Sequence, residues 1–154
     1  MIITLEGPGS VFVGKFFCHG DGRPTFSNHP VQFPTNCYDI TSLLLEHIDE
    51  LCNCNVLLFS GGGDPEFNML FDMRAKLHRP FSYLAMQVRR RLVEMYICRD
   101  DTGWVNNRLK SMADVIGTCK SDGNSVEVCL MDKRKGEERK LTIKKSEYQW
   151  LDDN

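Results

Sequence analysis

The stretch that decides the predicted fold is residues 55–64, Asn-Val-Leu-Leu-Phe-Ser-Gly-Gly-Gly-Asp. Residues 56–59 are an unbroken apolar run, which is typical of a strand buried on both faces. Three glycines follow, and Asp64-Pro65 then supplies the cap and first-turn residues that begin many helices. The stretch therefore predicts a buried strand over 55–60 and, through a glycine loop, a helix over 67–77.

Short strands and one helix are predicted before this stretch. Residues 2–5 are apolar, Gly-Pro-Gly at 7–9 is a turn signal, and residues 11–18 are rich in β-branched and aromatic side chains. These features predict a β-hairpin region, with an irregular third strand over 25–33. Apolar residues at helical spacing then predict a helix over 39–52.

The chain after residue 80 divides into a helical part and a β part. An apolar stripe predicts a helix over 82–98, and residues 104–112 could form a shorter one. The pattern then changes to a period of two, which predicts strands over 115–119 and 126–131 and a third through 141–143.

This order predicts an α+β fold rather than a regular alternation of strands and helices. It has an N-terminal β-hairpin region, three main helices, and a C-terminal three-stranded antiparallel meander. We expect a single domain over 1–154, with sub-units at 1–60, 61–113 and 114–154.

The first 60 residues resemble a known fold in their order of hairpin, helix and strand. The order ββαβ is similar to the start of a ubiquitin-like β-grasp. The apolar positions around His19-Gly20-Asp21 are similar in spacing to those of a doublecortin domain. That resemblance implies a β-grasp sub-unit and binding to microtubules.

Composition limits the classes of protein to consider. The 154 residues carry 19 Lys+Arg against 21 Asp+Glu, a net charge of −2, and 42% of them are hydrophobic. There is enough apolar material for a core, so a disordered chain is excluded. No apolar run approaches the roughly 18 residues that span a bilayer, and the near-neutral charge disfavours a globally basic nucleic-acid binder.

Seven scattered cysteines and no apparent leader predict reduced thiols inside a cell, in the cytoplasm or nucleus. Cys18-His19 and Cys52-Asn53-Cys54 are the only close pairs of metal ligands. Neither pair has the spacing of a structural zinc site, so no metal is expected.

The glycine loop is the first candidate for chemistry, as a phosphate site. It consists of Ser60, Gly61, Gly62, Gly63 and Asp64. Glycines let backbone N–H groups converge, and the start of a helix favours an anion. The string resembles the Ser-Gly-Gly-x-Asp-Ser loop of ATP pyrophosphatases, which implies binding of a nucleotide's pyrophosphate. It departs from that family at Pro65, where the family has a hydroxyl residue.

Cys37 is the second candidate. It precedes a predicted helix, whose dipole would lower the pKa of a thiol. Thiol proteases of the viral papain-like and ovarian-tumour types resemble this arrangement. They also need a histidine base, and the C-terminal strands contain none.

A basic face is the third candidate. Arg89 and Arg90 point away from the apolar stripe of the helix predicted over 82–98, and Arg74 and Lys76 lie shortly before it. These four residues are the predicted partner-binding surface.

No catalytic constellation is complete, so we predict a non-enzymatic intracellular module that binds another macromolecule. A protein partner is favoured, a homodimer is plausible, nucleic acid is not favoured, and no membrane or cofactor is expected. The alternative is an enzyme that binds a nucleotide or phosphate through Ser60–Asp64. A further alternative is a thiol hydrolase that uses Cys37.

Overall fold

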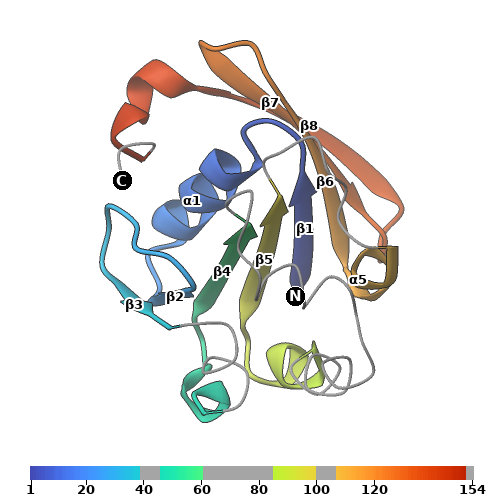
Figure 1. Cartoon of the computed structure of the whole chain (residues 1–154). Coiled ribbons are helices and arrows are strands. Elements are labelled where there is room, and N and C mark those ends of the chain that lie inside the picture. Colours follow the sequence, from blue (N-terminus) through green and yellow to red (C-terminus); the bar gives the residue numbers. More distant parts are fainter. Residues whose placement is uncertain (39–45, 61–84, 100–106, 152–154) are drawn as a thin grey trace.

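The computed structural model describes all residues except 39–45, 61–84, 100–106 and 152–154 (Figure 1). Within the described residues, eight strands form one sheet in the order β3-β2-β4-β5-β1-β6-β7-β8. The elements in chain order are β1 (Ile2–Glu6), α1 (Ser10–Asp21), β2 (Thr25–Ser27), β3 (Thr35–Cys37), η1 (Ile48–Glu50), β4 (Asn55–Ser60), β5 (Glu94–Arg99), α5 (Asn107–Met112), β6 (Val115–Ser121), β7 (Ser125–Asp132), β8 (Glu137–Lys144), η2 (Lys145–Glu147) and η3 (Gln149–Leu151).

The first six strands of this order are parallel, and β7 and β8 are antiparallel to their neighbours. A parallel sheet is covered on both faces, so its strands are apolar without alternation. In β4, Val56, Leu57 and Leu58 have no exposed surface. The prediction of a strand over 55–60 is confirmed, and residues 55–58 are buried.

The predicted fold class is wrong, because the strands do not form a hairpin region and a separate meander. β6 is parallel to β1, with Ile3 opposite Val115 and Glu6 opposite Thr118. The last three strands therefore continue the central sheet. The alternation of apolar and polar residues predicted where these strands lie in the sequence. It does not show which other strand pairs with β6.

The strand predicted over 11–18 is part of helix α1. Ser10, Gly14 and Cys18 are spaced four apart, and all three are buried. A Cβ added at Gly14 would lie 2.7 Å from the Cys98 sulfur and 2.8 Å from a Leu57 methyl. The helix thus meets the sheet in part through small residues, and hydropathy does not reveal that part of its face. Without the hairpin, the β-grasp order of residues 1–60 is absent.

The helix predicted over 82–98 is two elements. Residues 85–90 are helical, and β5 begins at Glu94. Leu92 lies between them with a φ of +57° and 70% of its surface exposed, and the Val93 N–H donates to the Val88 carbonyl. Val88 and Met95 nevertheless enter the same core, which explains their helical spacing in the sequence.

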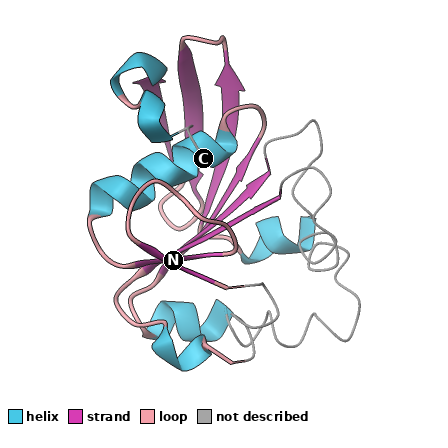
Figure 2. Cartoon of the chain, turned by 60° about the vertical axis from the view of Figure 1, so that its left-hand side comes forward, coloured by secondary structure: helices cyan, strands magenta, loops and turns pink. Residues whose placement is uncertain are grey.

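The two faces of the sheet are covered differently (Figure 2). On one face, Ile3 and Leu5 pack with Phe12 and Val13 of α1. On the other face, Ile2 packs with residues of the 85–90 helix and of α5. This layered arrangement is typical of α/β proteins.

The remaining helix predictions are only partly open to comparison. In the helix predicted over 39–52, residues 39–45 lie outside the described residues and 48–50 form the short η1. The helix predicted over 67–77 lies wholly outside them. The shorter helix predicted over 104–112 corresponds to α5.

Candidate functional site at the carboxyl edge of the sheet

The carboxyl ends of three parallel strands, β4, β5 and β1, lie at one level, and β6 continues past it. Arg99 at the end of β5 is opposite Ser60 of β4 and Glu6 of β1, and Glu6 is opposite Thr118 of β6. In open α/β sheets, ligands bind outside the carboxyl ends of the strands. The candidate site therefore lies at this edge.

The chain leaves β1 and β5 in opposite directions. From β1 it passes through α1 to β2, on the far side of β4 and β5. From β5 it passes through α5 to β6, on the other side of β1. Two neighbouring strands whose connections diverge define a topological switch point, and the crevice of such a sheet lies there.

A three-residue turn joins β1 to α1 at this point. Gly7 and Gly9 have φ of +102° and +88°, which favour glycine. The Gly7 N–H donates to the Arg99 carbonyl at 3.0 Å, which ties the turn to β5. The 12-residue helix α1 thus starts at the switch point, with the positive end of its dipole there.

The turn is packed tightly against the β6–β7 hairpin. A Cβ on Gly7 would overlap the carbonyl oxygen of Cys119, and one on Gly9 would lie 2.8 Å from a Val126 methyl. Ser10 has no exposed surface, and its hydroxyl has no hydrogen-bond partner among the described residues. The first turn of α1 is therefore covered on its β7 side.

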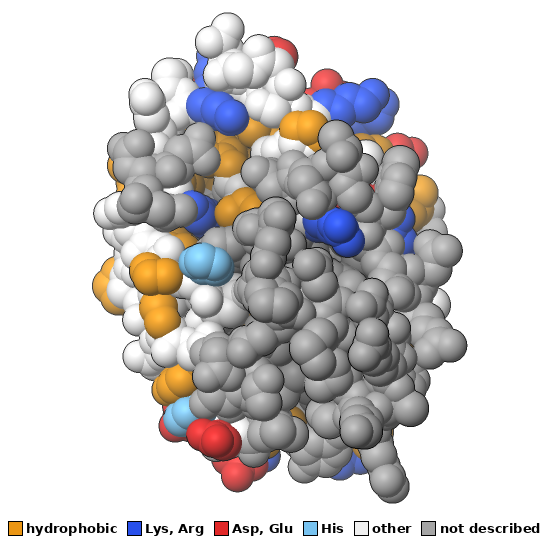
Figure 3. All heavy atoms as spheres, in the orientation of Figure 1, with side chains coloured by type: hydrophobic (Ala, Val, Ile, Leu, Met, Phe, Trp, Pro, Cys, Tyr) orange, Lys and Arg blue, Asp and Glu red, His pale blue; other side chains and the backbone are white. Residues whose placement is uncertain are grey.

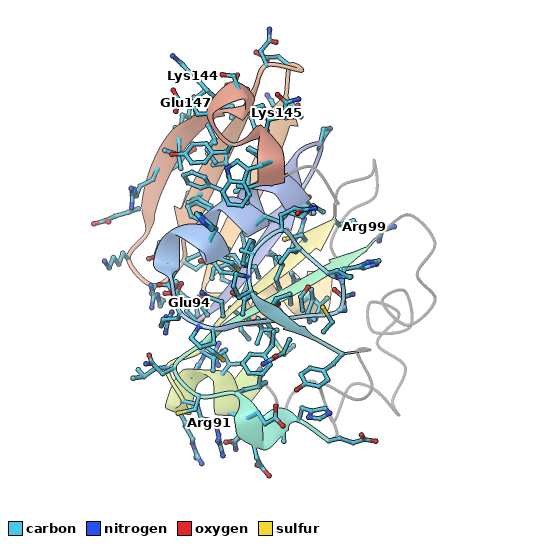
Figure 4. The ribbon with its side chains drawn as sticks, turned by 90° about the vertical axis from the view of Figure 1, so that its left-hand side faces the viewer. Arg91, Glu94, Arg99, Lys144, Lys145 and Glu147 are labelled. Carbon is cyan, nitrogen blue, oxygen red and sulfur yellow. The ribbon has the colours of Figure 1, made fainter. Side chains whose placement is uncertain are left out.

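Two ionic groups lie close to the turn. The Lys110 ammonium of α5 contacts the Glu6 carboxylate at 2.7 Å, and only 6% of the Glu6 side chain is exposed. Lys110 thereby offsets the negative charge at the end of β1. Arg99 is half-buried at the tip of β5 and adds a positive charge at the same edge (Figure 4).

The glycine loop predicted as a phosphate site begins at this edge. Ser60 is the last residue of β4 and lies opposite Arg99. Gly61, Gly62, Gly63 and Asp64 follow it directly in the sequence and lie outside the described residues. Phosphate binding by this loop therefore stays a prediction.

The predicted basic face is placed only in part. Arg89 donates to the Met112 carbonyl at 3.0 Å and lies 3.5 Å from Asp114, so it ties the 85–90 helix to the region of α5. Arg90 is exposed, and Arg74 and Lys76 lie outside the described residues. On the face in Figure 3, the Lys and Arg side chains of the described residues form separate groups, with no continuous basic surface. Partner binding there stays a prediction.

The cysteines supply no assembled site within the described part of the chain. Cys37 ends the exposed strand β3, and the first part of the helix predicted over 39–52, residues 39–45, lies outside the described part. Burial raises the pKa of the Cys54 thiol to about 11 and raises that of Cys18 further. No group of three His, Cys, Asp or Glu side chains that could hold a metal is found among the described residues.

A pocket of about 470 Å³ lies elsewhere. Cys18, His19, Arg23 and Thr25 are among its lining residues. Thr25 begins β2, so this pocket is at the opposite end of that strand from the carboxyl edge. Arg23 is held there by Asp21 at 2.5 Å, so its charge is already matched. The fold gives this pocket no connection to the switch point.

Sequence reasoning identified the turn at 7–9 but assigned it to a β-hairpin, and it missed the charges of Glu6, Arg99 and Lys110. The signal was present, because an apolar strand, a Gly-x-Gly turn and a helix form the start of a βα unit. Reading residues 11–18 as a strand concealed it. No local sequence pattern marks Arg99 or Lys110 as part of a site, because only the pairing of β5 and β6 with β1 brings them to this edge.

Comparison with known proteins gives the fold but no family. No family model matches the chain, and no curated protein matches it significantly. The N-terminal domain of zonular occludens toxin from Neisseria meningitidis is similar over 96% of both chains, at 12% identity and a TM-score of 0.58. B204, the DNA-packaging ATPase from Sulfolobus Turreted Icosahedral Virus, is similar over 90% of this chain and 95% of its own, at 8% identity and a TM-score of 0.62.

A KaiC-like protein from Pyrococcus horikoshii OT3 is also similar, over 92% of this chain and 82% of its own, at 8% identity and a TM-score of 0.53. These likenesses show an α/β fold like that of P-loop ATPases. The protein-binding module, which was the main prediction, finds no support in these likenesses. No helix among the described residues is long and apolar enough to cross a membrane.

The P-loop pattern itself is incomplete in this chain. Its consensus is Gly-x-x-x-x-Gly-Lys followed by Ser or Thr, with the lysine reaching the phosphates. Residues 9–15 fit the first seven positions, but Phe16 replaces the hydroxyl residue. Gly14 and Lys15 lie one turn inside α1, and the buried Lys15 donates to the Leu151 carbonyl at 3.0 Å. Lys15 therefore does not lie at the turn, and a phosphate would need another cation.

Proposed function

We propose that the chain binds a nucleotide through its phosphate groups at the carboxyl edge of the sheet, beside the switch point of β1 and β5. The observation that carries the proposal is the alignment of Ser60, Arg99 and Glu6 at one level on three adjacent strands. The likeness to ATPases supports it, since their fold recurs here over nearly the whole chain. Hydrolysis forms no part of the proposal.

In this proposal, Arg99 takes the place of the missing P-loop lysine as the main positive charge. An arginine can donate two parallel hydrogen bonds to a phosphate. The loop from Ser60 to Asp64 would add backbone N–H donors beside it. Lys110 is matched to Glu6 at 2.7 Å, so its role is to remove the repulsion between that carboxylate and a phosphate.

The test is the affinity of the purified chain for a fluorescent ATP analogue. Arg99→Gln should weaken binding by about tenfold or more, since a charge-assisted hydrogen bond contributes roughly 1.5–3 kcal/mol. Arg139→Gln makes the same change of charge in β8, four places along the sheet from β5, and should leave the affinity unchanged. Equal effects of the two variants, or no binding by the native chain, would contradict the proposal.

A second variant tests the glycine loop separately. Gly62→Asp places a negative charge beside the bound phosphates and should abolish binding. Gly123→Asp, in the β6–β7 turn where nothing lies within 4 Å of an added Cβ, is the control. If Gly62→Asp binds the ATP analogue as tightly as the control, the loop is not part of the site.

A further inference from the structure

The outer strand β8 is an open edge of the sheet. It is the last strand in the order, and β7 is its only partner among the described strands. Of its eight residues, only Ile143 is buried. An edge strand of this length presents a row of backbone donors and acceptors to any strand that can pair with it.

The register with β7 shows which backbone groups face outward. Lys145, one residue beyond β8, donates its N–H to the Asn124 carbonyl at 2.9 Å, and Lys144 is opposite Ser125. The direction of these groups alternates along a strand. Odd-numbered residues of β8 therefore face β7, and the N–H and carbonyl groups of Glu138, Lys140, Thr142 and Lys144 face the open edge.

We propose that β8 pairs with β8 of a second copy of this chain, antiparallel and about a two-fold axis at Leu141. A symmetric pair must place outward-facing residues opposite one another, so even-numbered residues face even-numbered ones. With the axis at Leu141, Lys140 is opposite Thr142 of the second copy and Glu138 is opposite Lys144. Each pair occurs twice, because a two-fold interface is self-complementary.

Charge selects this register over its neighbours. An axis at Lys140 would place that lysine opposite its own copy. An axis at Thr142 would place Lys140 opposite Lys144. Like charges directly opposite one another destabilise a strand pair, whereas opposite charges stabilise it. The register centred on Leu141 instead gives two Glu138–Lys144 pairs and an apolar contact on the axis.

The side chains of these pairs lie on the face of the sheet away from α1. Ile143 and Val126 are opposite one another in the core that includes α1, so the even-numbered side chains of β8 point to the other face. Glu138 there accepts a hydrogen bond from the Cys129 thiol at 2.7 Å. Lys144 stands at the far end of β8 (Figure 4).

Light scattering after size exclusion, over a range of protein concentrations, tests the proposal. The native chain should form a concentration-dependent dimer. Glu138→Lys and Lys144→Glu should each raise the dissociation constant about tenfold, since each places like charges opposite one another twice. The double variant restores opposite charges and should restore the dimer. A native monomer at every concentration would overturn the proposal, as would a dimer that ignores these changes.

Thr142→Pro gives a second test that spares the fold. It removes an N–H that faces the open edge, where proline is tolerated. The variant should keep the native circular dichroism spectrum and lose the dimer, while Thr142→Ala keeps both. The interface does not contain Arg99 or the glycine loop, so binding of the ATP analogue in the same samples reports the proposed function separately.

Discussion

Replacement of Gly7 by alanine tests the strand-to-helix turn at the switch point. Gly7 has a φ of +102°, and an added Cβ would overlap the Cys119 carbonyl oxygen of β6. Gly123 offers a matched control, because its φ is +93° and nothing lies within 4 Å of its added Cβ. The two substitutions share the backbone strain and differ in the steric overlap.

The expected losses of stability follow from the backbone strain and the steric overlap. A residue held in an unfavourable backbone region costs about 1–3 kcal/mol, and the reduced freedom of the unfolded chain offsets about 0.4–1 kcal/mol. Gly123→Ala should therefore destabilise the fold by roughly 1 kcal/mol. Overpacking adds about 1–3 kcal/mol, and a backbone atom yields less readily than a side chain, so Gly7→Ala should cost roughly 3 kcal/mol.

Urea unfolding, followed by far-ultraviolet circular dichroism, measures both free energies of unfolding under the same conditions. Equal losses in the two variants would refute the reasoning, because β6 would then not lie against the turn. If Gly7→Ala does not fold, the same question can be put to Gly9, whose Cβ would meet a Val126 methyl at 2.8 Å. Gly9→Ala should be less destabilising in a Val126→Ala background than in the native one.

Three further predictions concern titratable groups. Lys110→Met leaves the Glu6 carboxylate without its ammonium partner and should destabilise the fold by about 3 kcal/mol. In denaturant titrations, the double variant Glu6→Gln, Lys110→Met should lose less stability than the sum of the two single variants. Burial raises the pKa of Cys54 to about 11, so the folded thiol keeps its proton after the unfolded one has lost it. The free energy of unfolding should therefore fall as the pH rises from about 8.5 toward 11, and Cys54→Ala should reduce that fall. A native chain whose stability does not fall over this range would contradict the burial. Hydrogen bonds from the Ser125 and Asn124 backbones lower the pKa of Asp122. The ionised carboxylate therefore stabilises the fold above the ordinary pKa of Asp, and this stabilisation is lost as the pH falls through the lowered pKa. In thermal unfolding, Asp122→Asn should lose less stability below about pH 4 than the native chain does.

Where strands lie was more predictable than how they pair. Apolar runs located β1 and β4, and alternation located the C-terminal strands. Pairing depends on contacts between distant parts of the chain, such as β1 with β5 and β6 on either side. No local pattern records such contacts, so a parallel sheet was read as separate β regions.

The errors in helix α1 and strand β5 have physical causes. Helix α1 buries Ser10, Gly14, Lys15 and Cys18, which hydropathy does not mark as a core face. Apolar residues on both sides of Leu92 keep a helical spacing in the sequence. The chain nevertheless leaves the helix there, as the positive φ of Leu92 shows. The candidate site was predicted in part, because Ser60 reaches the edge through its own strand. Arg99 reaches the edge only through the pairing of β5 with β1 and β4.

The most direct test of the central claim is an ATP titration followed by two-dimensional amide NMR of the labelled full chain. Nucleotide binding at the switch point predicts shifts confined to the carboxyl edge, with the amides of Gly7, Ser10, Ser60 and Arg99 moving together and saturating with one affinity. The amides of Asp132 and Glu137, at the opposite edge, should not move. Shifts centred on that opposite edge, or none at millimolar ATP, would contradict nucleotide binding at the carboxyl edge.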